Sequence, residues 1–368
     1  MLLRYRARND QGTFPPQLSA TLDQIAGMRW PVLHFVFSCV LVLPSATVAQ
    51  DREAHNDSAD REVKTGTVLL QEGKYADAKV HFERAQNLEG KPTAQTSAGI
   101  GLAELQMGHF ASARQMFTLE LQLLTNDHAR AQAHYMIGSA WLREAKDDNA
   151  DKNKLQAAEK SFRDAVQLDS LYDLAYFNLG YALLRQDKKE ESNIAFRDFI
   201  KAAAANPESG GIPPLTSKTH IPEFALSDST GHSLTPESLH SRFILFDFWA
   251  TWCPPCLRAL PAMRQLSRFL PSNEFVLISV NEDDDRDVWQ RFSRAHDMDW
   301  TQAWDRNSNL YHDFALTPGS KLSLPRYVLV GPDGFVQHVY SGTDQLGLVV
   351  GQVVRTVQNS FPEGQRSN

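Results

Sequence analysis

The longest patterned stretch of the chain, residues 61–205, carries apolar positions at helical spacing and repeats itself. A glycine recurs at intervals of about 35 to 42 residues, at Gly66, Gly101, Gly138 and Gly180. After each glycine come a small residue and then a phenylalanine, at Ala78/Phe82, Ala113/Phe117, Ala158/Phe162 and Ser192/Phe196. Small residues let two helices approach closely, and aromatic rings fill the space between neighbours. The pattern predicts helix–turn–helix units throughout this stretch.

Polar segments border the helical stretch on both sides. Residues 51–60 are polar, which predicts a flexible lead-in. Residues 206–220 begin with a run rich in proline, glycine and serine, from Asn206 to Pro214. That composition is typical of a linker between domains.

Beyond the linker, apolar strands alternate with amphipathic helices. A turn at Asp228–Gly231, between Phe224–Leu226 and His232–Leu234, predicts a β-hairpin. Further strands are expected at Phe243–Trp249, Phe275–Val280, Arg326–Val330 and Val336–Tyr340, and helices at Leu257–Leu270, Asp285–Ala295, Leu310–Ala315 and Gln345–Gln358. The pattern predicts an α/β domain with a mixed sheet flanked by helices over residues 221–360, and a tail over 361–368.

An apolar run near the start of the chain resembles neither of these regions. Met28-Arg29-Trp30 precedes the run Pro31–Leu43, and a small-x-Ala sequence ends at Ala49. This order is typical of a secretory signal peptide, so we expect a leader over residues 1–50 with the signal at about 28–49. A buried strand or helix and a retained membrane anchor are the alternatives, although the run is short for a membrane span.

Composition narrows the class of protein. A chain of 368 residues is too long for one typical core, which favours two domains. The formal net charge is −7 and no Lys/Arg-rich cluster occurs, so we expect no nucleic-acid partner. Of the three cysteines, Cys39 lies in the predicted leader. The exported protein would therefore carry one close cysteine pair in an oxidising compartment.

That pair, Cys253-Pro254-Pro255-Cys256, stands between a predicted strand and a predicted helix. Unpaired N–H groups and the helix dipole at a helix N-terminus favour a thiolate. We expect Cys253 to be the exposed nucleophile and Cys256 the buried residue that resolves a mixed disulfide. Zinc sites use the same spacing, but no second cysteine pair supplies the further ligands. We therefore expect a redox disulfide, no metal and no cofactor.

Asp247 is an acidic residue inside an otherwise apolar strand. Strand alternation places it on the face of Leu245 and Trp249, where burial raises the pKa of a carboxyl group. Next to Cys256 it could exchange a proton with that thiol. A hydrogen-bonded structural aspartate is the alternative.

The helical stretch resembles tetratricopeptide (TPR) repeats, in four units over residues 61–205. The first unit matches the family at Gly66, Gly73, Tyr75, Ala78, Phe82 and Ala85. The third unit departs from the pattern by a charged insertion, Lys146–Asn153, and the fourth by Asp187 and Ser192. The resemblance implies an all-α solenoid whose concave face binds a protein or peptide. A plain helical bundle is the alternative.

Residues from about 215 to 360 resemble thioredoxin-fold proteins of the TlpA/ResA type, in the redoxin/AhpC-TSA-like superfamily. The resemblance is carried by Pro222–Leu226, the run Phe248–Cys256, Pro261 and Leu324-Pro325 before a strand. It implies that Pro325 is a cis-proline lying against the cysteine pair, and an ordinary trans turn is the alternative. It also implies that the substrate contacts Trp252, Pro254, Pro255 and Leu324.

Two positions depart from the TlpA-like pattern. Arg326 stands where those proteins more often have a small hydroxyl residue, so substrate contacts there are expected to differ. Ala259 stands where they commonly have a glutamate, while Asp247 matches the acid of thioredoxin itself. The acid has moved from the helix to the strand, so we expect a mechanism closer to that of thioredoxin.

Together these features predict an exported protein-disulfide oxidoreductase that reduces client disulfides through Cys253, Cys256 and Asp247. The resemblance implies a membrane thiol reductant as electron donor and a place in the bacterial periplasm or on the outer face of the cell envelope, membrane-anchored if the signal is uncleaved. One alternative is a TPR assembly protein whose dithiol is a redox sensor. A peroxiredoxin-like antioxidant is another, but Thr251-Trp252-Cys253 lacks the proline and threonine placement of that family.

Overall fold

The computed structural model describes residues 50–145, 151–206, 219–239, 241–306, 308–314, 323–342 and 346–361. The predicted signal peptide and Cys39 lie outside these residues. So do most of the predicted linker, part of the charged insertion and all but the first residue of the predicted tail.

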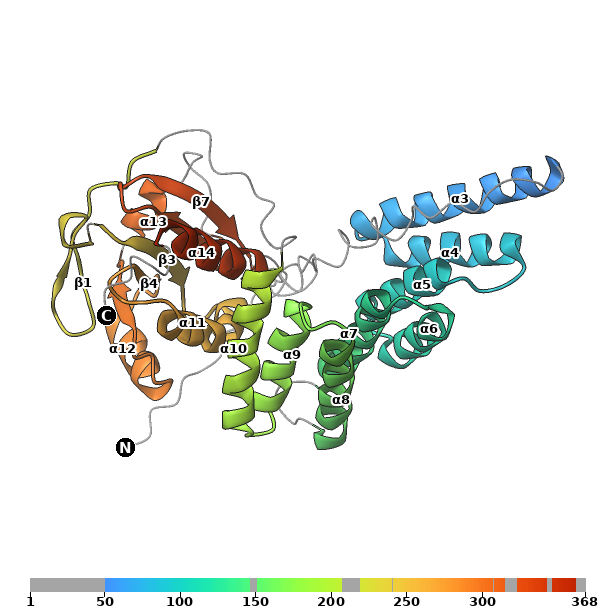
Figure 1. Cartoon of the computed structure of the whole chain (residues 1–368), viewed down its shortest axis with the longest axis horizontal. Helices are drawn as coiled ribbons and strands as arrows, with labels where there is room; N and C mark the ends of the chain where they lie inside the picture. Colours follow the sequence, from blue (N-terminus) through green and yellow to red (C-terminus); the bar gives the residue numbers. More distant parts are fainter. Residues whose placement is uncertain are drawn as a thin grey trace, which may run out of the picture. The chain divides into compact units, whose positions relative to one another are not determined.

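The first described region consists of helices in series (Figure 1). In chain order they are α3 (Gln50–Gln71), α4 (Tyr75–Glu89), α5 (Ala94–Gln106), α6 (Phe110–Leu123), α7 (Asp127–Glu144), α8 (Lys152–Leu168), α9 (Asp173–Leu184) and α10 (Lys189–Ala205). Each helix packs mainly against the helices before and after it in the chain. This arrangement of nearest neighbours is that of a helical solenoid.

The repeated glycines and phenylalanines meet in the structure as their spacing predicts. A Cβ atom added to Gly138 would lie 2.7 Å from Cε1 of Phe162, and one added to Gly101 would lie 2.7 Å from Cε1 of Phe117. Gly66 and Gly180 stand in the same relation to Phe82 and Phe196. The helices of a pair therefore approach through glycine, because any larger residue would displace the ring.

The segment 51–60 differs from its prediction. Helix α3 begins at Gln50, so these residues are helical rather than an irregular lead-in. The physical reason is that Ala59 and Val63 lie four positions apart on one helix face and are both buried. Arg61 supports the same turn by donating hydrogen bonds to the carbonyl of Asp57 and the hydroxyl of Ser58.

The second region is an α/β domain built on a five-stranded mixed sheet of order β5-β4-β3-β6-β7. The strands are β3 (Phe243–Trp249), β4 (Phe275–Asn281), β5 (Thr301–Trp304), β6 (Arg326–Val330) and β7 (Val336–Ser341). β3 pairs parallel with β4 and antiparallel with β6. β5 pairs parallel with β4, and β7 antiparallel with β6. The mixed sheet is as predicted, while β5 is an addition that the sequence pattern does not reveal.

Smaller elements complete the domain. A short hairpin of β1 (Leu226–Ser227) and β2 (Ser233–Leu234) precedes a 3-10 turn, η2 (Glu237–Leu239). The helices are α11 (Pro254–Phe269), α12 (Arg286–Ala295), α13 (Asn309–Asp313) and α14 (Leu346–Ser360). None of the described helices is both long and apolar enough to span a membrane.

The two faces of β3 pack into different clusters. Leu245 contacts a cluster that includes Met263 of α11 and Val350 of α14. Phe246, on the opposite face, packs with residues that include Phe314, directly after α13. Because side chains alternate along a strand, Asp247 lies on the face covered by α11.

Helix α10 belongs to both regions. Its residues Phe199, Ile200 and Ala203 are fully buried in the cluster formed with α11 and α14. At the end of α10, the guanidinium of Arg355 in α14 donates hydrogen bonds to the carbonyls of Ala203, Ala204 and Asn206, at 2.8, 3.3 and 3.0 Å. The last repeat helix and the α/β domain therefore share one core.

Candidate active site

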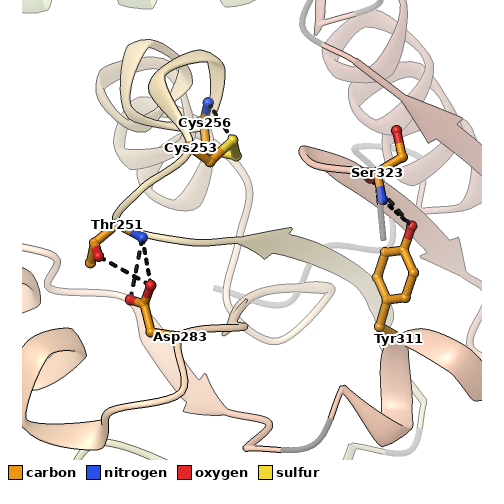
Figure 2. The surroundings of a disulfide bond; sticks show 6 residues. All are labelled: Thr251, Cys253, Cys256, Asp283, Tyr311 and Ser323. Atoms are coloured by element: carbon orange, nitrogen blue, oxygen red, sulfur yellow. Dashed lines mark hydrogen bonds between the residues drawn. A yellow bond between two sulfur atoms is a disulfide. The ribbon is translucent and has the colours of Figure 1, made fainter. Parts of the chain in front are cut away.

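The cysteine pair lies at the junction of β3 and α11 (Figure 2). Cys253 is the residue that caps the N-terminus of α11, and it is joined to Cys256 by a disulfide bond. The Cys253 sulfur also accepts a hydrogen bond from the backbone N–H of Cys256, with 3.3 Å between the two atoms. Pro254 and Pro255 occupy the first helical turn, where a missing N–H leaves no hydrogen bond unmade. The sulfur of Cys253 thus lies where helix N–H groups favour negative charge.

Burial around the pair corrects one expectation. Cys253 is only 4% exposed and Cys256 only 2%, so Cys253 is not the exposed residue of the two. The reason is that both cysteines, joined by the disulfide, pack in a cluster with Trp249, Leu260 and Trp289. The exposed residue is Trp252, with 59% of its surface accessible.

The loop that carries Cys253 is held by an acid from the neighbouring strand. Asp283, two residues after β4, accepts hydrogen bonds from the backbone N–H of Thr251 at 3.1 and 3.2 Å and from its hydroxyl at 3.1 Å (Figure 2). The sequence patterns do not single out Asp283. The signal in the sequence was a run of polar residues, Asn281-Glu282-Asp283, at the end of an apolar strand.

The peptide bond between Leu324 and Pro325 is cis, as the family resemblance implies. Strand register puts Arg326 opposite Phe248, so Pro325 stands beside the end of β3, where the cysteine loop begins. Leu324 packs against the cluster that contains both cysteines. The proline segment therefore lies at the same edge of the sheet as the disulfide.

A tyrosine fixes the approach to this proline. The hydroxyl of Tyr311 accepts a hydrogen bond from the Ser323 N–H at 2.8 Å and donates to the Ser323 carbonyl at 3.3 Å (Figure 2). Arg326 lies with its guanidinium 5.0 Å from the Tyr311 ring and donates to the carbonyl of Phe314 at 2.9 Å. The unusual arginine after Pro325 is thus buried, and it supports Tyr311.

Asp247 is 3% exposed, and burial raises its pKa to about 7, while a hydrogen bond from the Ser279 hydroxyl at 2.8 Å acts in the opposite direction. Ser279 in turn accepts a hydrogen bond from the Trp300 indole at 2.8 Å. On β3, Asp247 lies between Leu245, which packs under the middle of α11, and Trp249, which packs with the cysteines. The carboxyl group therefore lies beneath the first half of α11, which carries Cys256.

A second buried acid, Glu282, was not expected from the sequence. Burial raises its pKa to about 8, and the nearby carboxylates Asp305 and Asp283 act in the same direction. The backbone N–H of Glu282 donates to the Trp249 carbonyl at 2.9 Å, which ties β4 to the end of β3. Within the described parts of the chain, no group of three His, Cys, Asp or Glu side chains is arranged to hold a metal ion.

Comparisons with known proteins agree with this geometry. Residues 216–352 match the family model described as Redoxin. The chain is similar to the thiol-disulfide oxidoreductase ResA of Bacillus subtilis (strain 168), with 23% identity over 133 residues, which covers 36% of this chain and 72% of that protein. It is also similar to ResA of Halalkalibacterium halodurans, with 27% identity over 125 residues, covering 33% and 68%.

Among solved structures, the chain is similar to a putative thiol:disulfide interchange protein DsbE from Chlorobium tepidum. The identity is 23%, the match covers 39% of this chain and 99% of that one, and the TM-score is 0.35. StoA from Bacillus subtilis is 20% identical, with coverages of 34% and 95% and a TM-score of 0.30. The family match, the ResA relatives and the strand–Cys-x-x-Cys–helix geometry lead to one conclusion: residues 216–352 form a TlpA/ResA-like thioredoxin-fold redoxin domain, and the protein is a protein-disulfide oxidoreductase.

Proposed function

We propose that this protein is exported and reduces disulfide bonds in client proteins, with its helical repeats binding the client. The observation that carries the proposal is the position of the Cys253–Cys256 disulfide at the N-terminus of α11, beside the Leu324–Pro325 segment. A dithiol held at a helix N-terminus can be oxidised and reduced as a pair, because neither sulfur has to travel to meet the other.

The reaction would proceed by two exchanges. The Cys253 thiolate attacks one sulfur of the client disulfide, the client S–S bond breaks, and the other client sulfur leaves as a thiolate. The Cys256 thiolate then attacks the Cys253 sulfur, which releases the second client thiolate and forms the disulfide seen in the structure. Two electrons pass from the enzyme to the client. The Cys256 N–H that contacts the Cys253 sulfur is suited to stabilise the first thiolate.

Asp247 is the residue we assign to proton transfer with Cys256. Its pKa of about 7 is close to neutral, and a general base works best when its pKa lies near the operating pH. It is buried beneath the same helix that carries Cys256. It would accept the Cys256 proton during the second exchange.

The client would dock on the exposed rim of the pair. Trp252 and Pro254 are exposed and Pro255 is half-buried, so these residues offer apolar surface beside the sulfurs. Leu324 and Pro325 would lie along the client backbone on the other side. Electrons would return to the dithiol from a membrane thiol reductant.

The domain boundaries that we propose are those predicted from the sequence patterns. Residues 1–50 would be the leader, 61–205 a TPR-like array whose concave face binds a protein or peptide, 206–220 a linker and 221–360 the redox domain. Export into a bacterial periplasm, or to the outer face of the cell envelope, is supported by the predicted signal at about 28–49. Beyond that leader the chain holds only the two cysteines of one pair.

The test is capture of the client. In a Cys256→Ser variant the second exchange cannot occur, so Cys253 should stay bonded to the client as a mixed disulfide. Non-reducing electrophoresis of cells that express this variant should show adducts that dithiothreitol releases. A Cys253→Ser variant is the matched control and should form none. Equal adduct patterns for the two variants, or none for either, would count against client reduction.

One observation favours a second candidate function, a TPR assembly protein whose dithiol senses redox state. Because α10 shares its core with α11, a change at the dithiol could reach the repeats. A sensor would bind its partner differently in the oxidised and reduced forms without catalytic turnover. A reductase would turn over many disulfides per molecule when dithiothreitol is supplied.

A further inference from the structure

The segment that delivers Cys253 to the helix has little secondary structure to hold it. Ala250, Thr251 and Trp252 connect β3 to α11, and one backbone hydrogen bond, from the Cys253 N–H to the Ala250 carbonyl at 3.1 Å, closes the turn. Thr251 projects its N–H and its hydroxyl to the same side, toward Asp283 (Figure 2). Asp283 therefore supplies the side-chain hydrogen bonds that hold this turn, beside the packing of Ala250 and Cys253 in their apolar cluster.

Asp283 is itself fixed by several contacts. Its carboxylate accepts a hydrogen bond from the Asn281 side chain at 2.9 Å, and its N–H donates to the Asn281 side-chain oxygen at 3.0 Å. Its carbonyl accepts from the Trp304 indole at 2.7 Å. The residue is only 4% exposed. A buried group held at its side chain, N–H and carbonyl can act as a rigid anchor, since moving it would break several hydrogen bonds at once.

We propose that Asp283 is a positioning residue for the dithiol: through Thr251 it keeps Cys253 at the N-terminus of α11. The inference rests on the proposed role of Cys253 as the attacking thiolate. Without the anchor, the turn can move away from the helix end, and the thiolate loses part of the stabilisation by helix N–H groups. The pKa of the Cys253 thiol then rises toward its ordinary value of about 8.5.

A purely structural role for Asp283 makes a different prediction. If it only stabilises the end of β4, its loss lowers the unfolding temperature but leaves the reactivity of Cys253 in the folded protein unchanged. If its negative charge acts directly on the sulfur, its loss lowers the pKa of the thiol, because a nearby like charge disfavours a thiolate. The direction of the change therefore separates the three possibilities.

The experiment measures alkylation of the reduced full-length chain by iodoacetamide from pH 5 to 10, with mass spectrometry to assign the modified cysteine. The variants are Asp283→Ala, Asp283→Asn and Thr251→Val. The matched control is Asp284→Ala, which removes the same charge from an exposed position one residue away. Circular dichroism checks that each variant is folded.

Asp283→Ala should move the alkylation midpoint of Cys253 upward and slow the reaction at pH 7 by a factor of several to about ten. Asp283→Asn should give a smaller shift, since its amide oxygen can still accept from Thr251. Thr251→Val should give the smallest, since its N–H remains, and Asp284→Ala should match the wild type.

An unchanged or lowered midpoint in Asp283→Ala would overturn the proposal. Should that variant fail to fold, unchanged midpoints in both Asp283→Asn and Thr251→Val would do the same. The alkylation assay needs no client. A wild-type protein that fails to reduce clients would therefore contradict the proposed function without deciding whether Asp283 positions Cys253.

Discussion

The repeat helices and the redox domain are stabilised in different ways. In the repeats, each helix contacts its neighbours in the chain, and a glycine–phenylalanine contact recurs from pair to pair. In the redox domain, the central strand β3 pairs with β6, about 80 residues further along the chain, and the site is assembled from three separate segments. Sequence periodicity predicts contacts of the first kind. Contacts of the second kind join residues far apart in the chain, so no local pattern predicts them.

The two regions meet at α10. The largest predicted effect tests whether the stability of the redox domain depends on this helix. Phe199→Ala removes a ring that is fully buried against the redox domain and lies 5.5 Å from the Phe177 ring. We expect a loss of about 3 to 5 kcal/mol in the free energy of unfolding. Tryptophan fluorescence during guanidinium unfolding is the measurement, because five tryptophans lie in the redox domain and only Trp141 lies in the repeat helices α3 to α10.

The control for this experiment is Ile194→Ala on the same helix, where the side chain is 48% exposed and its loss should change stability by less than about 1 kcal/mol. A fluorescence transition that Phe199→Ala leaves unmoved would show that the redox domain does not depend on α10.

The next effect concerns a buried titratable group, Asp247. Its raised pKa of about 7 means that the folded protein binds a proton that the unfolded chain has already lost between about pH 4 and 7. Stability should therefore fall as the pH rises through this window. Asp247→Asn removes that loss and should raise the free energy of unfolding by about 2 to 4 kcal/mol at pH 8, with little change near pH 4.

Urea unfolding at both pH values measures the difference, and Asp284→Asn serves as the exposed control. An Asp247→Asn protein that gains no stability at pH 8 relative to pH 4 would contradict a raised pKa at this position.

A smaller effect tests the repeats alone. Gly138→Leu would drive a side chain into the Phe162 ring, and overpacking of this kind costs about 1 to 3 kcal/mol. Gln156→Leu, at an exposed position on α8, should have little effect. Thermal unfolding followed by circular dichroism gives the stabilities. Reduction of insulin disulfides per folded molecule, which does not require client binding by the repeats, should be the same for both variants. A selective loss in Gly138→Leu would show that the repeats shape the redox site.

The smallest effect concerns the proline segment. Tyr311→Phe removes the hydroxyl that hydrogen-bonds to Ser323. A hydrogen bond is worth about 1 kcal/mol, so we expect disulfide reduction to slow by a few-fold. Tyr340→Phe is a matched control, because that buried hydroxyl has no hydrogen-bond partner among the described residues. The initial rate of insulin disulfide reduction is the measurement. Equal rates for the two variants would show that the Tyr311 hydroxyl does not position Pro325.

Much of the fold could be predicted from local pattern. The glycine–phenylalanine spacing predicts the helix pairs, and the strand–helix alternation predicts the mixed sheet. The pattern misses β5, because a strand of four residues, Thr301–Trp304, is too short to show a period. It also misses the docking of α10, although one signal was present. The apolar stripe of α10 does not end at the repeat residue Phe196 but continues through Phe199, Ile200 and Ala203, at positions i+3, i+4 and i+7 on the same face.

The candidate site was predicted less completely. Cys253 and Cys256 could be named from a motif, Asp247 from a break in an apolar run, and Pro325 from the family resemblance alone. Asp283 and Tyr311 hydrogen-bond to Thr251 and Ser323, which lie 32 and 12 positions away in the chain. No local sequence pattern predicts contacts over such separations. The predicted exposure of Cys253 was wrong, since in the disulfide form its side chain packs in a buried cluster with Trp249 and Trp289.

The most direct test of the central claim is the reduction of insulin disulfides by the chain from residue 51 onward, with dithiothreitol present to regenerate the dithiol. The wild-type protein should accelerate insulin precipitation well above the dithiothreitol background, and Cys253→Ser should return the rate to that background. A wild-type rate equal to the background, or a Cys253→Ser rate equal to the wild type, would contradict disulfide exchange at this pair.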